Sequence, residues 1–179
     1  LVGNGGAPRA SIFMGKGDKE SAERTLGNCF TTQIIVSLLL TIILFTGNRS
    51  FLMAFGASEN TIPYAVAYMN IYSLGTIFVQ LTLGMNAFIT AQGFARTGML
   101  SVLVGAASNM DPVFIFVFHM GVRGAALATI ISQALSCAWV LNFLTGKKSY
   151  LKIRRCNMKL QKNIILPSLA LVLSTFIMQ

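Results

Sequence analysis

The chain has 179 residues, of which 54% are hydrophobic and 11% are charged, and its mean hydropathy is +0.68. Soluble domains carry about 25% charged residues, so this composition argues against a soluble protein and indicates lipid as the solvent. The net charge of +9 would suit nucleic acid on a soluble face, but here the basic residues fall in gaps between apolar runs, so no nucleic-acid partner is expected.

Apolar runs of about 20 residues, the length that spans a bilayer as a helix, recur along the chain. They predict the end of a helix at 1–14, complete spans at 29–46, 63–90, 98–118 and 123–144, and the start of another helix at 163–179. Pro63 suits the first turn of its helix. The uncharged stretch from Asn60 to Ala95 is about 54 Å long as a helix, so its ends are expected to project or to bend, with Gly75 and Gly84 as candidate soft points. We therefore predict an all-α, polytopic membrane protein.

The two ends of the sequence indicate a piece of a longer protein. There is no initiator Met and no signal peptide of the usual form, and the chain stops inside an apolar run. The three cysteines are odd in number and match no metal-binding spacing, so free thiols are expected.

The gaps between the spans alternate in charge, which predicts the topology. Basic residues concentrate in the first, third and fifth gaps, at 15–27, 91–97 and 145–162. The other side holds Arg49 and Arg123 alone among the fourteen Lys and Arg residues. The positive-inside rule places the three basic loops in the cytoplasm, at the cell inner (plasma) membrane. Loop 145–162 is interpreted mainly as a topological anchor, with a specific anionic-lipid site as the weaker option.

Asp111 is the strongest candidate for a functional residue. It is the only acidic residue between Asn60 and the end of the chain, and it lies in an apolar run. A charged residue at the centre of a span costs about 2.5–3.5 kcal/mol on insertion scales, so it is usually functional. Pro112 follows directly and disfavours a regular helix at Asp111. The expected kink would bring Asn109 and Asp111 to one cavity, facing Thr129 on the next span.

These three side chains offer a carboxylate, an amide and a hydroxyl, which are oxygen ligands that Na⁺ prefers. The Asp111 carboxylate would be the main ligand of Na⁺, or, with its pKa raised by desolvation, would carry H⁺ instead. The alternative is a structural Asp that caps the kink or joins a hydrogen-bond network.

Polar side chains within the spans must face protein or water. Those expected along a substrate path are Gln33, Gln80 and Gln133, although each is individually more typical of contacts between helices. Small residues recur every four positions from Gly124 to Ser136, which predicts close helix packing. The sequence contains no nucleophile–base pair, phosphate loop or Cys/His cluster, so neither an enzyme nor a cofactor is expected.

Four stretches resemble the MATE (multidrug and toxic compound extrusion) family of efflux transporters, bacterial type. They are GGAPRASIFMGKGDKESAERTLGN, FGASENTIPYAVAYMNIYSLGTIF, MNAFITAQGFARTGML and DPVFIFVFHMGVRGAALATIISQ. The resemblance covers nearly the whole chain and implies part of a twelve-helix transporter with two six-helix lobes. Residues 1–144 would supply N-lobe helices from the end of helix two to helix six. Loop 145–162 would join the lobes, and 163–179 would begin helix seven.

The resemblance also implies a cation site in the N-lobe. Asn109, Asp111 and Thr129 stand at the places of the family's Asn and Asp of helix five and Thr of helix six. The family usually spaces the Asn and Asp four positions apart, whereas here they are two apart, as after a two-residue deletion. The family's helix-one Asp has no counterpart in the chain.

The resulting hypothesis is a cation-coupled antiporter that uses Na⁺ or H⁺ to export amphiphilic, cationic drugs or toxic compounds. Its partners would be these small molecules, the lipid bilayer and the remaining helices of the full-length transporter. One alternative is a flippase for lipid-linked oligosaccharides in the same superfamily. Another is a non-functional transporter fragment.

Overall fold

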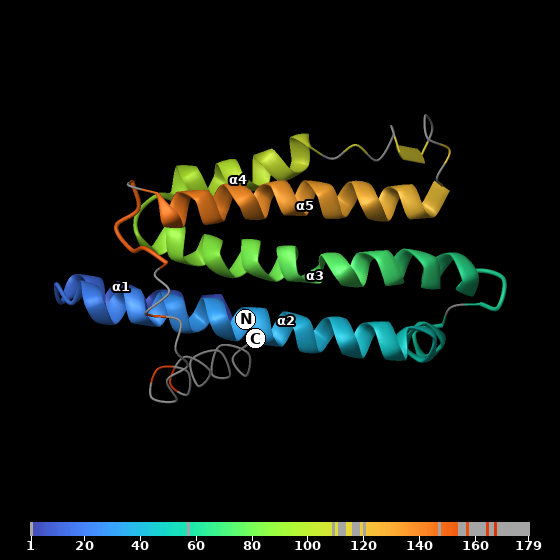
Figure 1. Ribbon diagram of the computed structural model, residues 1–179, viewed down its shortest axis with the longest axis horizontal. Helices are drawn as coiled ribbons and strands as arrows, with labels where there is room; N and C mark the ends of the chain where they lie inside the picture. The colour runs from blue at the N-terminus through green and yellow to red at the C-terminus, as the bar shows by residue number, and fades with distance from the viewer. Residues whose placement is uncertain are drawn as a thin grey trace.

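The chain forms a bundle of α-helices, shown by the computed structural model in Figure 1. The structure describes residues 2–56, 58–108, 110, 114–115, 119, 121–146, 148–153, 157, 164 and 167. Its helices are α1 (Val2–Gly15), α2 (Lys19–Ala54), α3 (Ile62–Ala91), α4 (Ala95–Ala107) and α5 (Gly121–Thr145). Consecutive helices run antiparallel, and the described part of the chain contains no strand. The prediction of an all-α membrane protein is confirmed.

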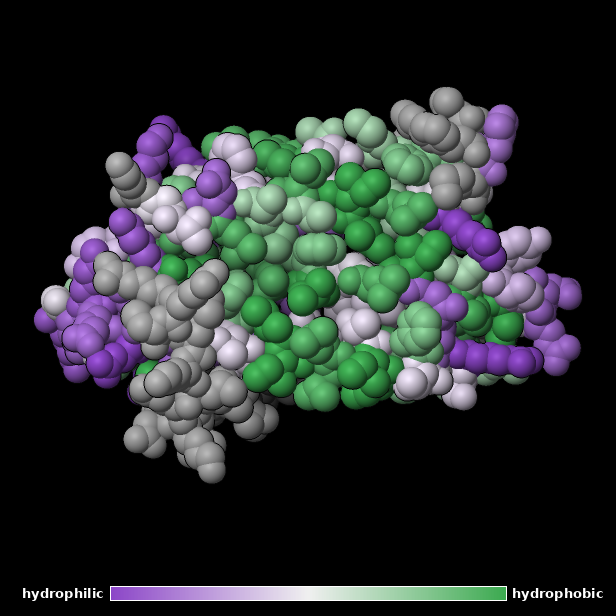
Figure 2. Space-filling view, in the orientation of Figure 1, coloured by the Kyte–Doolittle hydropathy of each residue, from purple (hydrophilic) through white to green (hydrophobic). Residues whose placement is uncertain are grey.

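The surface of the bundle suits a bilayer. Helices α2, α3 and α5 are long and apolar enough to cross a membrane. Figure 2 shows a hydrophobic band between two hydrophilic ends. Helix α2 exposes Leu38, Ile42 and Phe45 by 51%, 59% and 54%. An apolar surface of this extent is unfavourable in water, and lipid removes that cost.

The helix bounds differ most from the expected spans in α2 and α4. Helix α2 exceeds the span expected at 29–46 at both ends, so much of the gap expected at 15–27 is helical. At 1.5 Å per residue α2 is about 54 Å long, well beyond the roughly 30 Å of the hydrocarbon core. Helix α4 ends at Ala107, well before the end of the span expected at 98–118.

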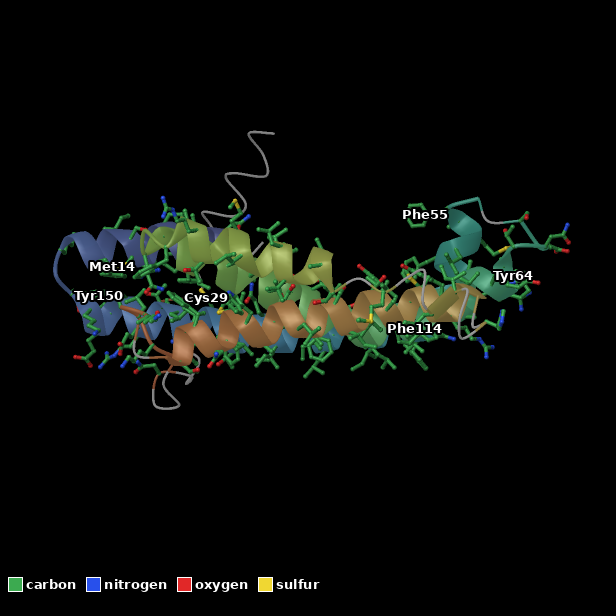
Figure 3. The ribbon with its side chains drawn as sticks, turned by 90° about the horizontal axis from the view of Figure 1, so that it is seen from above. Met14, Cys29, Phe55, Tyr64, Phe114 and Tyr150 are labelled. Carbon is green, nitrogen blue, oxygen red and sulfur yellow. The ribbon has the colours of Figure 1, made fainter. Side chains whose placement is uncertain are left out.

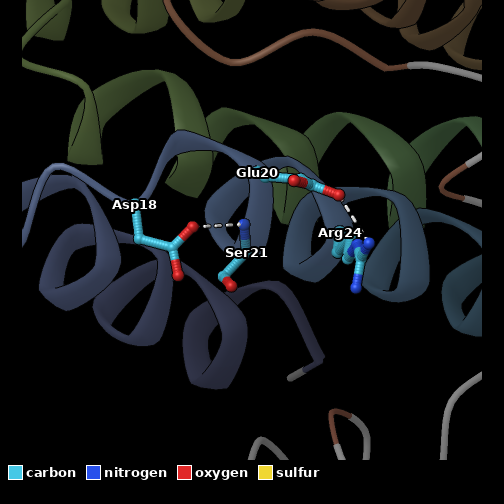
Figure 4. Close-up of polar contacts among 4 residues, drawn as sticks. All are labelled: Asp18, Glu20, Ser21 and Arg24. Carbon is cyan, nitrogen blue, oxygen red and sulfur yellow. Dashed lines mark hydrogen bonds and ion pairs between the residues drawn. The ribbon is translucent and has the colours of Figure 1, made fainter.

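The start of α2 is fixed by a side-chain cap. Asp18 Oδ1 accepts a hydrogen bond of 3.0 Å from the backbone N–H of Ser21 (Figure 4). This satisfies a donor that has no partner within the helix. Hydrogen bonds from the hydroxyl and the N–H of Ser21 lower the pKa of Asp18. Glu20 pairs with Arg24 one turn further on, but both are exposed, so this ion pair contributes little. The charged segment before the first full span is thus an ordered helix start.

Helix α3 is the centre of the bundle, since it contacts each of the other four helices. Its glycines allow close approach. A Cβ at Gly75 would collide with Ile130 of α5, and one at Gly84 would collide with the side chain of Gln33 of α2. Helix α3 is nevertheless continuous from Ile62 to Ala91. These glycines therefore serve close packing, and the expectation that they are points of bending stays a prediction.

The small-residue stripe of α5 packs as predicted. Ser132 and Ser136 are buried, as are Gly124 and Ala128. The Ser136 hydroxyl donates a hydrogen bond of 2.8 Å to the Ser101 carbonyl of α4. A Cβ at Gly105 would collide with Ser136 Oγ. Small side chains thus bring the backbones of α4 and α5 together, as is common in membranes.

Residues 148–153, here called the strap, fold back onto the bundle after α5. Leu151 is fully buried in the main hydrophobic cluster. Oε1 of Gln92 accepts hydrogen bonds from the Ser149 hydroxyl at 3.0 Å and the Leu151 N–H at 2.9 Å. The Ile153 N–H donates to the Leu144 carbonyl at 3.3 Å. The described part of the loop expected at 145–162 is thus docked on the bundle.

Substitution of Gly84 tests the packing of α3. Gly84→Ala should lower the stability of the detergent-solubilised protein by about 1–3 kcal/mol, because the new methyl group overpacks the contact with Gln33. Gln33→Ala in the same chain should restore much of the loss by removing the colliding amide. Thermal unfolding followed by size-exclusion chromatography measures both effects.

Gly3→Ala is the matched control, because its new Cβ would meet the backbone of Gly84 rather than a side chain. Gln33→Ala should therefore not rescue it. Equal rescue of both glycine variants would contradict this account of the contact.

Substitution of Gln92 tests the strap. Gln92→Leu removes the acceptor of two hydrogen bonds and leaves the Leu151 N–H buried without a partner, at a cost of about 1–3 kcal/mol. Deuterium exchange of the peptide that contains the strap should become faster. Gln92→Glu keeps an acceptor oxygen and should retain slow exchange. Unchanged exchange in Gln92→Leu would show that Gln92 does not hold the strap.

Candidate functional site

The structure describes one member of the expected cation site. Thr129 lies in the first half of α5 and is partly buried. Its hydroxyl donates a hydrogen bond of 2.9 Å to the Ala125 carbonyl. Because the hydroxyl proton is used in this way, the oxygen lone pairs remain available as acceptors for a cation. Asn109 and Asp111 lie outside the described residues, so their placement beside Thr129 stays a prediction.

The described residues on either side of that pair show where the helix of the third expected span stops. Helix α4 is followed by Ser108, whose N–H donates to the Val104 carbonyl at 3.0 Å. Further along, the Phe114 N–H donates to the Met110 carbonyl at 3.1 Å. Helix α4 thus ends four positions before Asp111, whereas the steric effect of Pro112 restricts the residue directly before it.

The three glutamines expected along a substrate path lie on different helices. Gln33 of α2 is 3% exposed, and its Oε1 is buried without a hydrogen-bond partner. Gln80 of α3 and Gln133 of α5 are partly buried. The structure therefore shows Gln33 as a packing residue against Gly84 and leaves the path as a prediction.

Polar side chains also connect α2 to α3 directly. Asn48 Nδ2 donates to Asn70 Oδ1 at 2.8 Å and lies 3.3 Å from the Val66 carbonyl. The Thr41 hydroxyl donates to the Ser73 carbonyl at 3.0 Å. Asn70 was recognisable from the sequence as a polar residue inside a span, but its partner Asn48 was not. Such bonds are worth about 0.6 kcal/mol on average in membrane proteins, so they orient helices more than they stabilise them.

The connections that carry the basic loops lie at one end of the bundle, here called the basic end. In Figure 3, Met14 and Tyr150 lie at one end, and Phe55, Tyr64 and Phe114 lie toward the other. The first end carries the connections that follow α1, α3 and α5 (Figure 1). The loops expected at 15–27, 91–97 and 145–162 thus meet at one end in their described parts.

Two cation–π contacts add to this basic end. Lys19 Nζ lies 4.7 Å from the ring centre of Tyr150, and the Arg9 guanidinium lies 5.7 Å from that of Phe13. The first contact joins the start of α2 to the strap. The buried carboxylate of Glu23 faces the same segment and accepts a 3.4 Å hydrogen bond from the Lys152 N–H. Sequence reasoning missed this role of Glu23, because the partners are distant along the chain.

Among the residues that the structure describes, no group of three or more His, Cys, Asp and Glu side chains is placed to hold a metal ion. The described contacts at the basic end are hydrogen bonds and cation–π contacts. What the bundle offers is a set of packed membrane-spanning helices with polar side chains between them.

Comparison with known proteins finds similarity to membrane transporters. The MatE family model matches residues 1–115. The multidrug export protein MepA of Staphylococcus haemolyticus is 28% identical over 153 residues, which are 84% of this chain and 34% of that protein. A MATE transporter solved in a bent conformation is 25% identical with a TM-score of 0.89, over 98% of this chain and 41% of the other.

An inward-facing multidrug resistance MATE family transporter gives a TM-score of 0.90 over 96% of this chain and 40% of its own, at 23% identity. The chain thus spans about a third of the MepA protein and two fifths of these solved structures. Since the family model covers more than half of the chain, the chain belongs to the MatE family of multi-pass membrane transporters.

Proposed function

We propose that this chain supplies most of the N-lobe of a cation-coupled multidrug antiporter. The observation that carries the proposal is the match of the helical bundle, over nearly its full length, to MATE transporters. A similar protein, MepA, is named for multidrug export. The transported compounds would be amphiphilic organic cations, and the coupling ion would be Na⁺ or H⁺. In this arrangement residues 1–144 belong to the N-lobe, 145–162 join the lobes, and 163–179 begin the second lobe.

The coupling would depend on Asp111. A ligand shifts a conformational equilibrium only through its different affinities for the two states. A carboxylate that binds a cation in one state and releases it in the other provides that difference. Asn109 would add an amide oxygen, and Thr129 the hydroxyl oxygen whose proton is bonded to Ala125. The coupling ion is a transported substrate of this cycle.

The basic connections give the proposed orientation of the chain in the membrane. The basic connections meet at one end of the bundle in their described parts. The positive-inside rule assigns that end to the cytoplasm of the inner (plasma) membrane. Gln80 and Gln133, both partly buried, would line the route of the drug with Gln33, and the remaining helices would complete the cavity.

Asp111→Asn tests the coupling in the full-length protein. The amide keeps the shape of the side chain but removes the charge that binds the cation, so drug resistance and ethidium export should fall to the level of cells without the transporter. Membrane insertion should be unchanged. Asp18→Asn is the control, because this capping residue is fully exposed outside the spans and should export normally.

Undiminished export by Asp111→Asn would contradict the proposal. Loss of lipid flipping, in place of ethidium export, would assign the protein to the flippase alternative. If the Asp111→Asn protein does not reach the membrane, Asp111→Glu is tested in its place. This variant keeps the charge and should retain partial export.

Thr129→Val tests the hydroxyl ligand. Valine preserves the branched shape while removing the oxygen, so the concentration of coupling ion needed for half-maximal export should rise by about tenfold, as one ligand is lost (~1.4 kcal/mol). Thr129→Ser should stay close to the parent. The measurement is ethidium export from vesicles over a series of Na⁺ concentrations and pH values. An unchanged ion dependence in Thr129→Val would remove Thr129 from the site.

A further inference from the structure

A cavity of about 410 Å³ lies where α5 meets the strap. It is lined by Trp139, Asn142, Phe143, Gly146 and Lys148. The two aromatic side chains and the glycine form an apolar part, while Asn142 and Lys148 bring an amide and an ammonium group. The cavity is at the basic end of the bundle, away from Thr129 and the expected cation site.

The cationic group at this cavity has no carboxylate partner in the described structure. The one ion pair found among the described residues joins Glu20 to Arg24, and Lys148 is exposed. The next residue, Ser149, is buried and bonded to Gln92. The strap therefore fixes the backbone beside Lys148 and holds an uncompensated positive charge at the edge of the cavity.

An apolar stripe leads along α5 to the cavity. Ile131, Leu135 and Trp139 follow one another every four positions and are 44%, 47% and 41% exposed. Residues four apart share one face of a helix, so these side chains form a continuous apolar surface. Trp139 ends the stripe about 9 Å before the end of α5, at 1.5 Å per residue. This is the depth at which tryptophan commonly marks the membrane interface.

From these features we propose that the cavity binds the headgroup of an anionic phospholipid from the cytoplasmic leaflet. The acyl chains lie along Ile131 and Leu135. The phosphate takes the place of the missing carboxylate at Lys148, and the amide of Asn142 and the indole N–H of Trp139 are the available hydrogen-bond donors. Charge complementarity selects an anionic lipid, since the adjoining segment is also rich in Lys and Arg. The proposal goes beyond drug export and rests only on the proposed orientation of the chain in the bilayer.

The test uses the full-length protein in vesicles that contain brominated phosphatidylglycerol or brominated phosphatidylcholine. Bromine quenches the fluorescence of nearby tryptophan. The fluorescence of Trp139 is obtained as the difference between the parent protein and Trp139→Phe. Brominated phosphatidylglycerol should quench Trp139 at a lower mole fraction than brominated phosphatidylcholine. Lys148→Gln should reduce this preference about fivefold, the effect of one basic residue at a membrane surface.

Lys16→Gln is the matched control, because Lys16 is an exposed basic residue outside the cavity and its loss changes the net charge equally. It should keep the preference for phosphatidylglycerol. An equal fall in Lys16→Gln and Lys148→Gln would overturn the proposal in favour of general surface charge. Equal quenching of the parent by the two lipids would also overturn it.

Two further outcomes separate other occupants. Absence of quenching by either lipid would show that another helix of the transporter covers this face. Loss of the preference on addition of soluble glycerol phosphate would assign the cavity to a free phosphate compound. Either result overturns the lipid assignment without bearing on drug export, which ethidium transport measures separately.

Discussion

Close contact at Gly84 is the constraint on which the arrangement of α1, α2 and α3 depends. Lipid tails are as apolar as the helix surfaces, so burial of apolar area does little to bring helices together in a membrane. Dispersion contacts then matter most, and they require backbones to approach closely. Gly84 meets Gln33 of α2 on one contact and Gly3 of α1 on another. One position without a side chain thus allows three helices to pack, and α3 can contact every other helix of the bundle.

The polar contacts between the helices depend on that packing. Once the backbones are close, short side chains such as Thr41 and Ser136 can reach a carbonyl of the neighbouring helix. Each bond satisfies a group that lipid cannot hydrate. The same closeness confines Gln33, whose side-chain oxygen Oε1 is buried without a hydrogen-bond partner. A helix interface built in this way holds its side chains in well-defined positions.

The features that could be predicted from the sequence are those that depend on local composition. The all-α membrane class was evident from the long apolar runs, and the buried stripe of α5 from the spacing of its small residues.

Contacts that are distant along the chain were harder to predict. Gly75 and Gly84 were considered as soft points of α3, but their packing contacts were missed, because a sequence does not show which neighbour fills the space beside a glycine. The charged segment before α2 was expected as a gap, although Asp18 caps a helix there. The docking of Leu151 depends on Gln92, nearly sixty positions earlier, and no local pattern indicates it. Asn109 and Asp111 were identified from the cost of a charge in lipid, and their mutual geometry stays a prediction.

The strap has a mechanical consequence for the connection that it begins. A free linker over 145–162 would reach roughly 60 Å when fully extended, enough slack to absorb large motions of the segment after it. Instead, the chain is attached again at the Asn157 carbonyl, 3.4 Å from Asn28 Nδ2, and at the Ile164 carbonyl, 3.1 Å from the Arg9 guanidinium. Between those two anchors the contour length is at most about 25 Å. The two attachments therefore tie this connection to α2 and to α1 with little slack.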